Sequence, residues 1–265
     1  MADSLFARDA DAIVPSVLAR GPWSADALHG GPVAALLAGL AEQLPQAGPM
    51  QPVRLTVDLR RPVPLLPLTA EARVLRPGRK VQLVESSLWH AGQELARATL
   101  LSIRREPVPL PEQHAGSRSL APPGPDTAQA SASATPDWSG GAVAFHSHGV
   151  EHRIVRGSWA QPGPCTDWIR LRVPVLDGDE PTPLQRVAVA ADFANGISGA
   201  LPFGEWRFIN PDLTLHLQRL PRGAWVCVDA QTWLESEGIG LAECTLYDEQ
   251  GRLGHGLQSL LLERA

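Results

Sequence analysis

Two segments of the 265-residue chain, 158 positions apart, have similar sequences and constrain the fold more than any other feature. Residues 55–90 align with residues 213–248 without a gap. The identical pairs are Leu55/Leu213, Thr56/Thr214, Leu59/Leu217, Arg61/Arg219, Ala72/Ala230, Leu83/Leu241, Glu85/Glu243 and Leu88/Leu246. The period is too long for a solenoid of short repeats, so it predicts a duplicated domain.

The first copy has the alternation of an antiparallel sheet. Residues 54–60 place leucine and valine on one side and polar groups on the other, which predicts a half-buried strand. Residues 69–75, 81–89 and 95–103 are further strand candidates, separated by short turns that contain glycine. Short turns between alternating strands favour an antiparallel meander.

A helix is predicted before these strands. Pro32 suits the first turn of a helix, and residues 33–41 are rich in Ala and Leu on nearly every face. A helix that is apolar all round is a buried helix. We therefore expect an α+β fold in which a sheet wraps around a central helix.

The second half repeats this order. A helix is predicted to open at residues 182–184 and to run through 187–193, with a stop at Asn195-Gly196. The strand candidates that follow are residues 213–219, 225–234, 239–247 and 253–262, and an additional pair precedes the helix at 150–155 and 168–173. We predict domains at 1–105 and 143–265, joined by a Pro/Ser/Ala-rich linker at 106–142.

Composition excludes several classes of protein. The net charge is −5 with no long run of one sign, which argues against a nucleic-acid-binding face. No apolar run reaches the length of a membrane span, and the acidic N-terminus lacks the pattern of a secretory signal. The odd number of cysteines, Cys165, Cys227 and Cys244, favours buried free thiols in a reducing cytoplasm.

The two copies differ at polar positions. Arg54, Val74 and Thr99 of the first copy align with Asp212, Thr232 and Gln258 of the second, the last pair with one extra residue in the preceding turn. Thr232 and Gln258 interrupt apolar faces, and a buried polar group without a partner costs about 1–3 kcal/mol. The three residues are predicted either to form a buried hydrogen-bond network or to share a ligand.

The glycines at the first helix start have two interpretations. Gly30 and Gly31 could simply permit a tight turn, or they could let a substrate oxygen approach unpaired N–H groups at the helix N-terminus. The His29-Gly30-Gly31 motif is also found in α/β-hydrolases, but the Gly-x-Ser-x-Gly elbow of that fold is not in this sequence. A metal site at His146, His148 and His152 is disfavoured, because no carboxylate or thiolate follows at suitable spacing.

Several short motifs together resemble a known family. They are His29-Gly30-Gly31, Leu59-Arg60-Arg61-Pro62, Trp168-Ile169-Arg170, Ala191-Asp192-Phe193, Pro211-Asp212-Leu213-Thr214 with Arg219, and Gly256-Leu257-Gln258-Ser259. In order and spacing the chain resembles the double-hotdog acyl-CoA thioesterases of the bacterial acyl-CoA thioesterase II type. The resemblance implies two tandem hotdog domains packed as a pseudo-dimer, with the acyl chain at their interface.

The resemblance also implies residue roles. An Asp, a Thr or Ser and a Gln of the second hotdog activate water in that family, and here they fall on Asp212, Thr232 and Gln258. Oxyanion stabilisation or substrate binding falls on His29, Gly30, Gly31 and Asp192. The expected partner is an acyl-CoA, with no cofactor or metal, and a cytoplasmic homo-oligomer is expected.

Two alternatives to thioester hydrolysis stay open, as does the choice of residues that would bind the CoA phosphates. A non-catalytic acyl-CoA- or lipid-binding hotdog protein is the first alternative. A hotdog hydratase or dehydratase is the second, and it needs an aspartate paired with a histidine near the helix start. His29 could be the base, but Asp26 precedes it and no aspartate follows at short spacing. The basic residues considered as partners for CoA phosphates are Arg60, Arg61, Arg76, Arg79 and Lys80.

Overall fold

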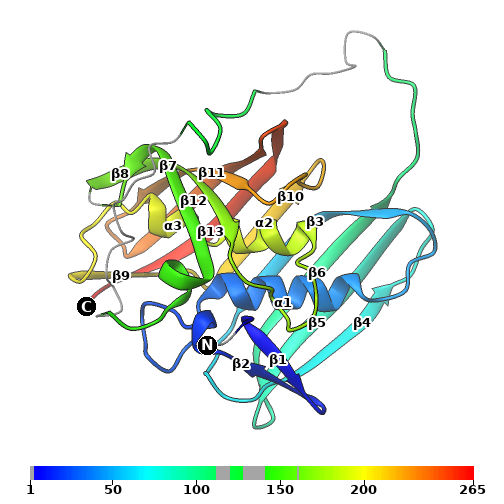
Figure 1. The fold of residues 1–265 in the computed structure, drawn as a ribbon, viewed down its shortest axis with the longest axis horizontal. Helices are drawn as coiled ribbons and strands as arrows, with labels where there is room; N and C mark the ends of the chain where they lie inside the picture. Colours follow the sequence, from blue (N-terminus) through cyan, green and yellow to red (C-terminus); the bar gives the residue numbers. More distant parts are fainter. Residues whose placement is uncertain (1–2, 112–119, 128–140, 160) are drawn as a thin grey trace.

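A single antiparallel sheet wrapped around two helices forms the body of the molecule (Figure 1). The computed structural model describes residues 3–111, 120–127, 141–159 and 161–265. Parts of the predicted linker, residues 112–119 and 128–140, lie outside the described residues. The predicted domain boundaries at 1–105 and 143–265 stay a prediction.

In the first half, the described residues form one helix and six strands. They are β1 (Phe6–Asp9), β2 (Ala12–Pro15), α1 (Gly30–Glu42), β3 (Met50–Leu59), β4 (Thr69–Arg76), β5 (Val81–His90) and β6 (Gln93–Arg104), with a short turn of helix, η1 (Val17–Ala19), after β2. The predicted helix and the four predicted strands are confirmed, but the four-strand meander is wrong. Only β4, β5 and β6 pair in chain order, and β3 pairs with β6, which places β3 at the opposite edge of this half from β4. The small β1–β2 hairpin was not predicted.

The second half follows the same plan. Its elements are η3 (Phe145–Gly149), β7 (Val150–Ser158), β8 (Gln161–Leu171), α2 (Pro183–Ala191), α3 (Ala194–Ile197), β9 (Trp206–Ile209), β10 (Asp212–Leu217), β11 (Val226–Leu234), β12 (Ile239–Asp248) and β13 (Gly251–Arg264). The stop predicted at Asn195-Gly196 is wrong, because α3 adds one more helical turn there. β9 and α3 were also missed, since segments of four residues are too short for a periodic pattern to be seen.

The two halves join through their β3 and β10 strands. The sheet order is β4-β5-β6-β3-β10-β13-β12-β11-β8-β7, with β9 paired to β13. β3 and β10 are antiparallel, and Thr56 pairs with Thr214, which is its equivalent in the repeat. A pseudo-two-fold axis therefore passes between these threonines, as expected for a duplicated domain.

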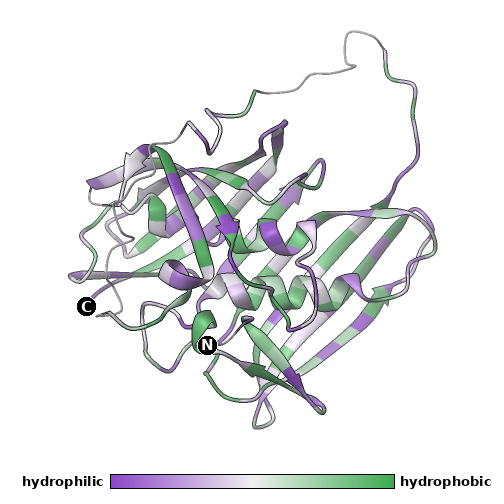
Figure 2. Cartoon of the chain, in the orientation of Figure 1, coloured by the Kyte–Doolittle hydropathy of each residue, from purple (hydrophilic) through white to green (hydrophobic). Residues whose placement is uncertain are grey.

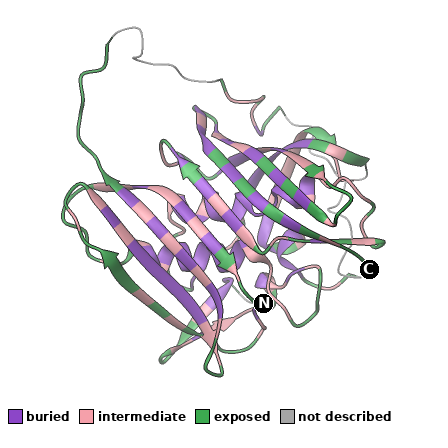
Figure 3. Ribbon diagram, turned by 180° about the vertical axis from the view of Figure 1, so that it is seen from behind, coloured by how far each residue is buried: buried purple, intermediate pink, exposed green. Residues whose placement is uncertain are grey.

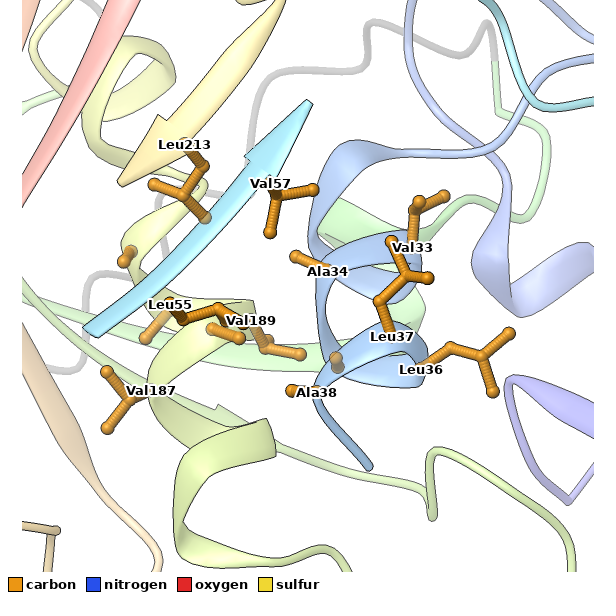
Figure 4. Close-up of a cluster of buried hydrophobic side chains, with 14 of the residues drawn as sticks. Val33, Ala34, Leu36, Leu37, Ala38, Leu55, Val57, Val187, Val189 and Leu213 are labelled. Carbon is orange, nitrogen blue, oxygen red and sulfur yellow. The ribbon is translucent and has the colours of Figure 1, made fainter. Parts of the chain in front are cut away.

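The core lies between the sheet and the two helices. Ala34 of α1 points toward Val57 on β3, and Val189 of α2 lies beside Leu55 of the same strand (Figure 4). The strands alternate between hydrophilic and hydrophobic residues, whereas α1 is apolar along most of its length (Figure 2). From behind, buried and exposed residues alternate along the strands (Figure 3). The packing of α1 beside α2 brings the start of each helix to the end of the other.

Candidate active site

The candidate site lies where α1 begins and α2 ends. His29 is the N-cap of α1, and Asp192 is the C-cap of α2. Nδ1 of His29 lies 2.9 Å from Oδ2 of Asp192 and 3.1 Å from the backbone N of Gly31. A protonated Nδ1 donates to the carboxylate, and an unprotonated Nδ1 accepts from the Gly31 N–H, so the two contacts belong to different protonation states of this nitrogen.

The glycines make room for this carboxylate. A Cβ atom on Gly30 would lie 2.7 Å from Oδ1 and 2.9 Å from Oδ2 of Asp192. A Cβ atom on Gly31 would lie 3.2 Å from the Val189 carbonyl oxygen and 3.3 Å from the Phe145 ring. Only glycine at position 30 lets the carboxylate approach the positive end of the α1 dipole this closely.

Two side-chain amides hold the carboxylate from the other side. Nδ2 of Asn210 donates to Oδ1 of Asp192 at 2.9 Å, and Nε2 of Gln258 donates to the same oxygen at 3.3 Å and to the Asp192 carbonyl oxygen at 3.2 Å. Oε1 of Gln258 accepts from the backbone N of Asn195 at 3.1 Å, which fixes the orientation of the amide. Asp192 and Gln258 are 4% and 0% exposed, so this network is shielded from solvent except through the cavity beside it.

A cavity of about 510 Å³ opens onto this network. Its polar wall includes His29, Gly30, Asp192, Asn195 and Asn210. Its apolar and basic walls are formed by residues of both halves, among them Trp23, Leu28, Val33, Leu59, Arg60, Arg61, Val63, Phe193, Phe203, Arg207 and Phe208. A mostly apolar cavity with a few converging polar groups is typical of a small-molecule site.

Two members of the predicted trio do not join this network. The predicted cluster of Asp212, Thr232 and Gln258 is not formed. Asp212 shares the outer face of β10 with Thr214, because Leu213 faces the core, and its Oδ1 accepts from the backbone N of Ser259 at 2.8 Å. Parity therefore places Asp212 on the opposite face of the sheet from the buried Gln258.

Thr232 lies on the inner face of the sheet but too far from Gln258 to contact it. It pairs with Ala242, which in turn pairs with Gln258, so one whole strand separates the two polar residues. Two strand spacings amount to about 10 Å. The Thr232 hydroxyl instead lies 2.8 Å from the Ser198 hydroxyl, just after α3.

The alignment of Gln258 with Thr99 is also wrong. Gln258 pairs with Ala242, and the repeat equivalent of Ala242 is Val84, which pairs with Leu100. Both hairpins turn through two residues and carry a register shift at the same place, so no extra residue is needed. The first half thus has a buried leucine where the second half has the amide.

Asn210 is the residue that the sequence prediction missed. The repeat aligns it with Pro52, at the irregular start of β3, so the comparison of copies gave no polar contrast in a regular strand. The sequence feature that could have identified Asn210 is its position just before Pro211, where a strand begins. The four predicted oxyanion or substrate-binding residues, His29, Gly30, Gly31 and Asp192, do lie together.

The other residues considered from sequence are dispersed. Of the basic residues considered for CoA, Arg60 and Arg61 line the cavity, whereas Arg76, Arg79 and Lys80 are not among its lining residues.

Of the histidines considered as metal ligands, His152 contacts a carboxylate: its Nδ1 lies 2.5 Å from Oδ2 of Asp167. Within the described ranges, no group of three or more His, Cys, Asp or Glu side chains could hold a metal ion. In the same part of the chain, no helix is long and apolar enough to cross a membrane.

The cysteines are buried and unpaired with one another. Burial raises the pKa of the Cys165 and Cys244 thiols to about 12 and that of Cys227 further still. All three thiols are therefore protonated at neutral pH and poorly reactive.

Comparisons with solved structures show the same fold. A hotdog-fold protein of unknown function from Alicyclobacillus acidocaldarius matches with a TM-score of 0.71 and 19% identity, covering 98% of this chain and 97% of that one. The tesB protein of Mycobacterium avium subspecies paratuberculosis matches with a TM-score of 0.67 and 16% identity, covering 97% and 96%. The acyl-CoA thioesterase II TesB2 of Mycobacterium marinum matches with a TM-score of 0.64 and 14% identity, covering 97% and 93%.

Family models match both halves of the sequence. Residues 19–103 match the acyl-CoA thioesterase N-terminal domain, and residues 121–262 match the acyl-CoA thioesterase C-terminal domain. A search of curated proteins found no match. The double-hotdog fold and the two matched models agree, and the chain belongs to the acyl-CoA thioesterase family.

Proposed function

We propose that the protein hydrolyses acyl-CoA thioesters to a free acid and CoA. The observation that carries the proposal is the Asp192 carboxylate, fixed by Asn210, Gln258 and the α1 N-terminus at the wall of a largely apolar cavity. Family membership supports the same reaction class. The cavity draws its lining from both halves, so one duplicated chain carries one site.

The proposed chemistry needs one activated water. Asp192 accepts a proton from the water, whose oxygen attacks the thioester carbonyl carbon. The C–S bond then breaks, and the thiolate leaves and takes up a proton as free CoA. Asn210 and Gln258 hold the carboxylate and orient the water, the roles first predicted for Thr232 and Gln258, while Asp192 takes the role first predicted for Asp212.

The start of α1 supplies the positive potential for the oxyanion. The N–H groups of the first helical turn have no intrahelical partner, and Gly30 is part of the cavity wall. A donor of this kind contributes about a 10²- to 10³-fold increase in kcat in well-studied hydrolases. This role explains why a glycine at position 30 benefits catalysis as well as packing.

The test is thiol release from a panel of acyl-CoAs of different chain length. The free thiol is followed with a disulfide reagent, and the buried cysteines of the protein should give little background. Turnover of at least one acyl-CoA is expected. Binding of the panel without thiol release would contradict the proposal and favour a non-catalytic acyl-CoA-binding protein.

One observation favours a second function. The hydratase alternative needs an aspartate beside His29, and Asp192 occupies that place at 2.9 Å although it comes from the other half of the chain. The same preparation should therefore be given a trans-2-enoyl-CoA. Loss of the enoyl absorbance without thiol release would identify a hydratase, and thiol release alone would identify a thioesterase.

Two further expectations are proposed on the family resemblance. We propose that the protein is a homo-oligomer and acts in the cytoplasm. Light scattering of the purified chain tests the first expectation, because a mass equal to that of one 28.4 kDa chain would contradict it.

A further inference from the structure

The charged part of the cavity wall is basic, although the chain is acidic overall. Arg60, Arg61 and Arg207 line the cavity, and Asp192 is the acid among the described lining residues. The whole chain carries a net charge of −5. A local excess of arginine in an acidic protein creates a positive field at one place, which attracts an anionic ligand.

Among the described residues, Arg61 lacks the ion pair that its counterpart in the repeat makes. Its equivalent, Arg219, donates to both carboxylate oxygens of Asp248, at 2.5 and 2.6 Å, and also to the Gly251 carbonyl oxygen. Asp248 is fully buried, and these bonds pin the β12–β13 hairpin. The position equivalent to Asp248 in the first half is His90, whose Nδ1 lies 2.9 Å from the Pro67 carbonyl oxygen. Both copies thus have an arginine at this position, but the carboxylate that binds it in the second half is replaced by His90 in the first.

The three arginines of the cavity are not equally available. Arg60 pairs with Glu94 at 2.9 Å. Arg61 and Arg207 are exposed and have no ion pair among the described residues, although Glu263 is the cross-strand neighbour of Arg207. Arg61 follows β3 of the first half and Arg207 lies on β9 of the second, so the two approach the cavity from different halves.

We propose that Arg61 and Arg207 bind the phosphate groups on the carrier half of the thioester and so select a phosphorylated carrier. This inference rests on the proposed function for the identity of the ligand. A guanidinium presents several N–H donors in one plane and matches the oxygens of a phosphate, which makes arginine a preferred phosphate ligand. The phosphate can come from CoA or from phosphopantetheine attached to a carrier protein.

Equilibrium binding tests the proposal without requiring turnover. The probes are CoA, phosphopantetheine and pantetheine, titrated into the wild-type protein and into Arg61→Gln and Arg207→Gln by calorimetry. CoA should bind more tightly than pantetheine to the wild type, and each variant should lose about 10-fold in CoA affinity with unchanged pantetheine affinity. The advantage of CoA should also shrink as salt is added.

The matched control is Arg76→Gln. Arg76 is an exposed arginine at the end of β4 that does not line the cavity, so its replacement should leave both affinities unchanged. Phosphopantetheine binding that equals CoA binding would assign the recognised phosphate to the arm that carrier proteins share, and weaker binding would assign it to the nucleotide.

Equal affinity of the wild type for CoA and pantetheine would overturn the proposal, as would Arg61→Gln and Arg207→Gln variants that bind CoA normally. Turnover is measured separately on matched acyl-CoA and acyl-pantetheine thioesters. If arginine-dependent CoA binding is found without hydrolysis of either thioester, the proposed function fails while the phosphate site stands. If wild type and variants all hydrolyse both thioesters equally well, the proposed function stands and the phosphate site fails.

Discussion

The two ends of the α1–α2 helix pair are related by the duplication, and in the described part of the chain they differ: the end where α1 begins has the features of an active site. At one end, the start of α1 meets Asp192 beside the cavity. At the other end, the start of α2 meets the end of α1, and Thr182 caps α2 in a capping box with Gln185. Nε2 of Gln185 donates to the Ala35 carbonyl oxygen, so this side chain fills the space between the helices.

Equivalent positions of α1 and α2, counted from the N-cap of each helix, carry different residues. Asp192 is the tenth residue after the N-cap Thr182, and Gly39 is the tenth after the N-cap His29. A Cβ atom on Gly39 would lie 2.3 Å from Nε2 of Gln185. The second half thus has a carboxylate where the first has a glycine covered by an amide, and Gln258 where the first has Leu100. The two ends therefore differ in a few polar groups: Asp192 lines a cavity at one end, and Gln185 fills the space at the other.

The largest effect is expected from replacing the carboxylate of the candidate site. Asp192→Asn should keep the hydrogen bonds of Asn210 and Gln258 in part but cannot accept a proton from water, so kcat should fall on the order of 10²- to 10⁴-fold. Steady-state thiol release from the best acyl-CoA measures the loss. The matched control is Glu42→Gln at the opposite end of the helix pair, which should keep nearly full turnover. Near-normal kcat for Asp192→Asn would remove Asp192 from the mechanism.

The next effect tests the glycine at the α1 start. In Gly30→Ala the new methyl group would meet the Asp192 carboxylate at 2.7 Å, so the carboxylate must move away from the helix N-terminus. We expect kcat to fall by roughly 10²-fold, since the carboxylate proposed as the general base would lose its alignment with the water. Ala substitution at Gly196, which has open space around its Cβ position and also lines the cavity, is the control. Equal activity in the two variants would contradict this explanation of Gly30.

A reciprocal exchange between the halves sharpens the comparison further. Gln258→Leu copies the first half into the second and removes an amide that holds Asp192, so kcat should fall about 10-fold or more. Leu100→Gln does the reverse and buries an amide without a designed partner, which should cost about 2–4 kcal/mol of unfolding free energy and leave kcat unchanged. Thiol release and urea unfolding of both variants separate the two effects. Similar losses of activity in both would mean that the two positions are not functionally different.

Much of the fold was predictable because duplication and strand alternation are properties of the sequence itself. The repeat offset identifies Thr56 and Thr214 as equivalent residues, and the structure adds that these two pair across the pseudo-two-fold axis. The site was predicted only in part. Asp192 was expected from the family resemblance, but the repeat comparison pointed to Asp212, whose strand parity turns it to the outer face. Asn210 and Asp192 meet because the start of β10 packs against the end of α2. The periodic pattern of a single segment cannot predict such a contact.

The smallest expected effect concerns stability at the opposite end of the helix pair. Burial raises the pKa of the Glu42 carboxyl to about 6, and the Thr182 hydroxyl, 2.5 Å away, partly offsets the rise. The folded protein therefore binds this proton more tightly than the unfolded chain, and the associated stability is present below about pH 4.5 and lost as the pH rises through about 6. Glu42→Gln cannot ionise, so its unfolding free energy at pH 8 should exceed that of the wild type by about 1–2 kcal/mol, with little difference near pH 4.5. Urea unfolding at the two pH values measures this, with the exposed Glu180→Gln as the control. A gain of the same size at both pH values would trace the effect to packing and not to the buried charge.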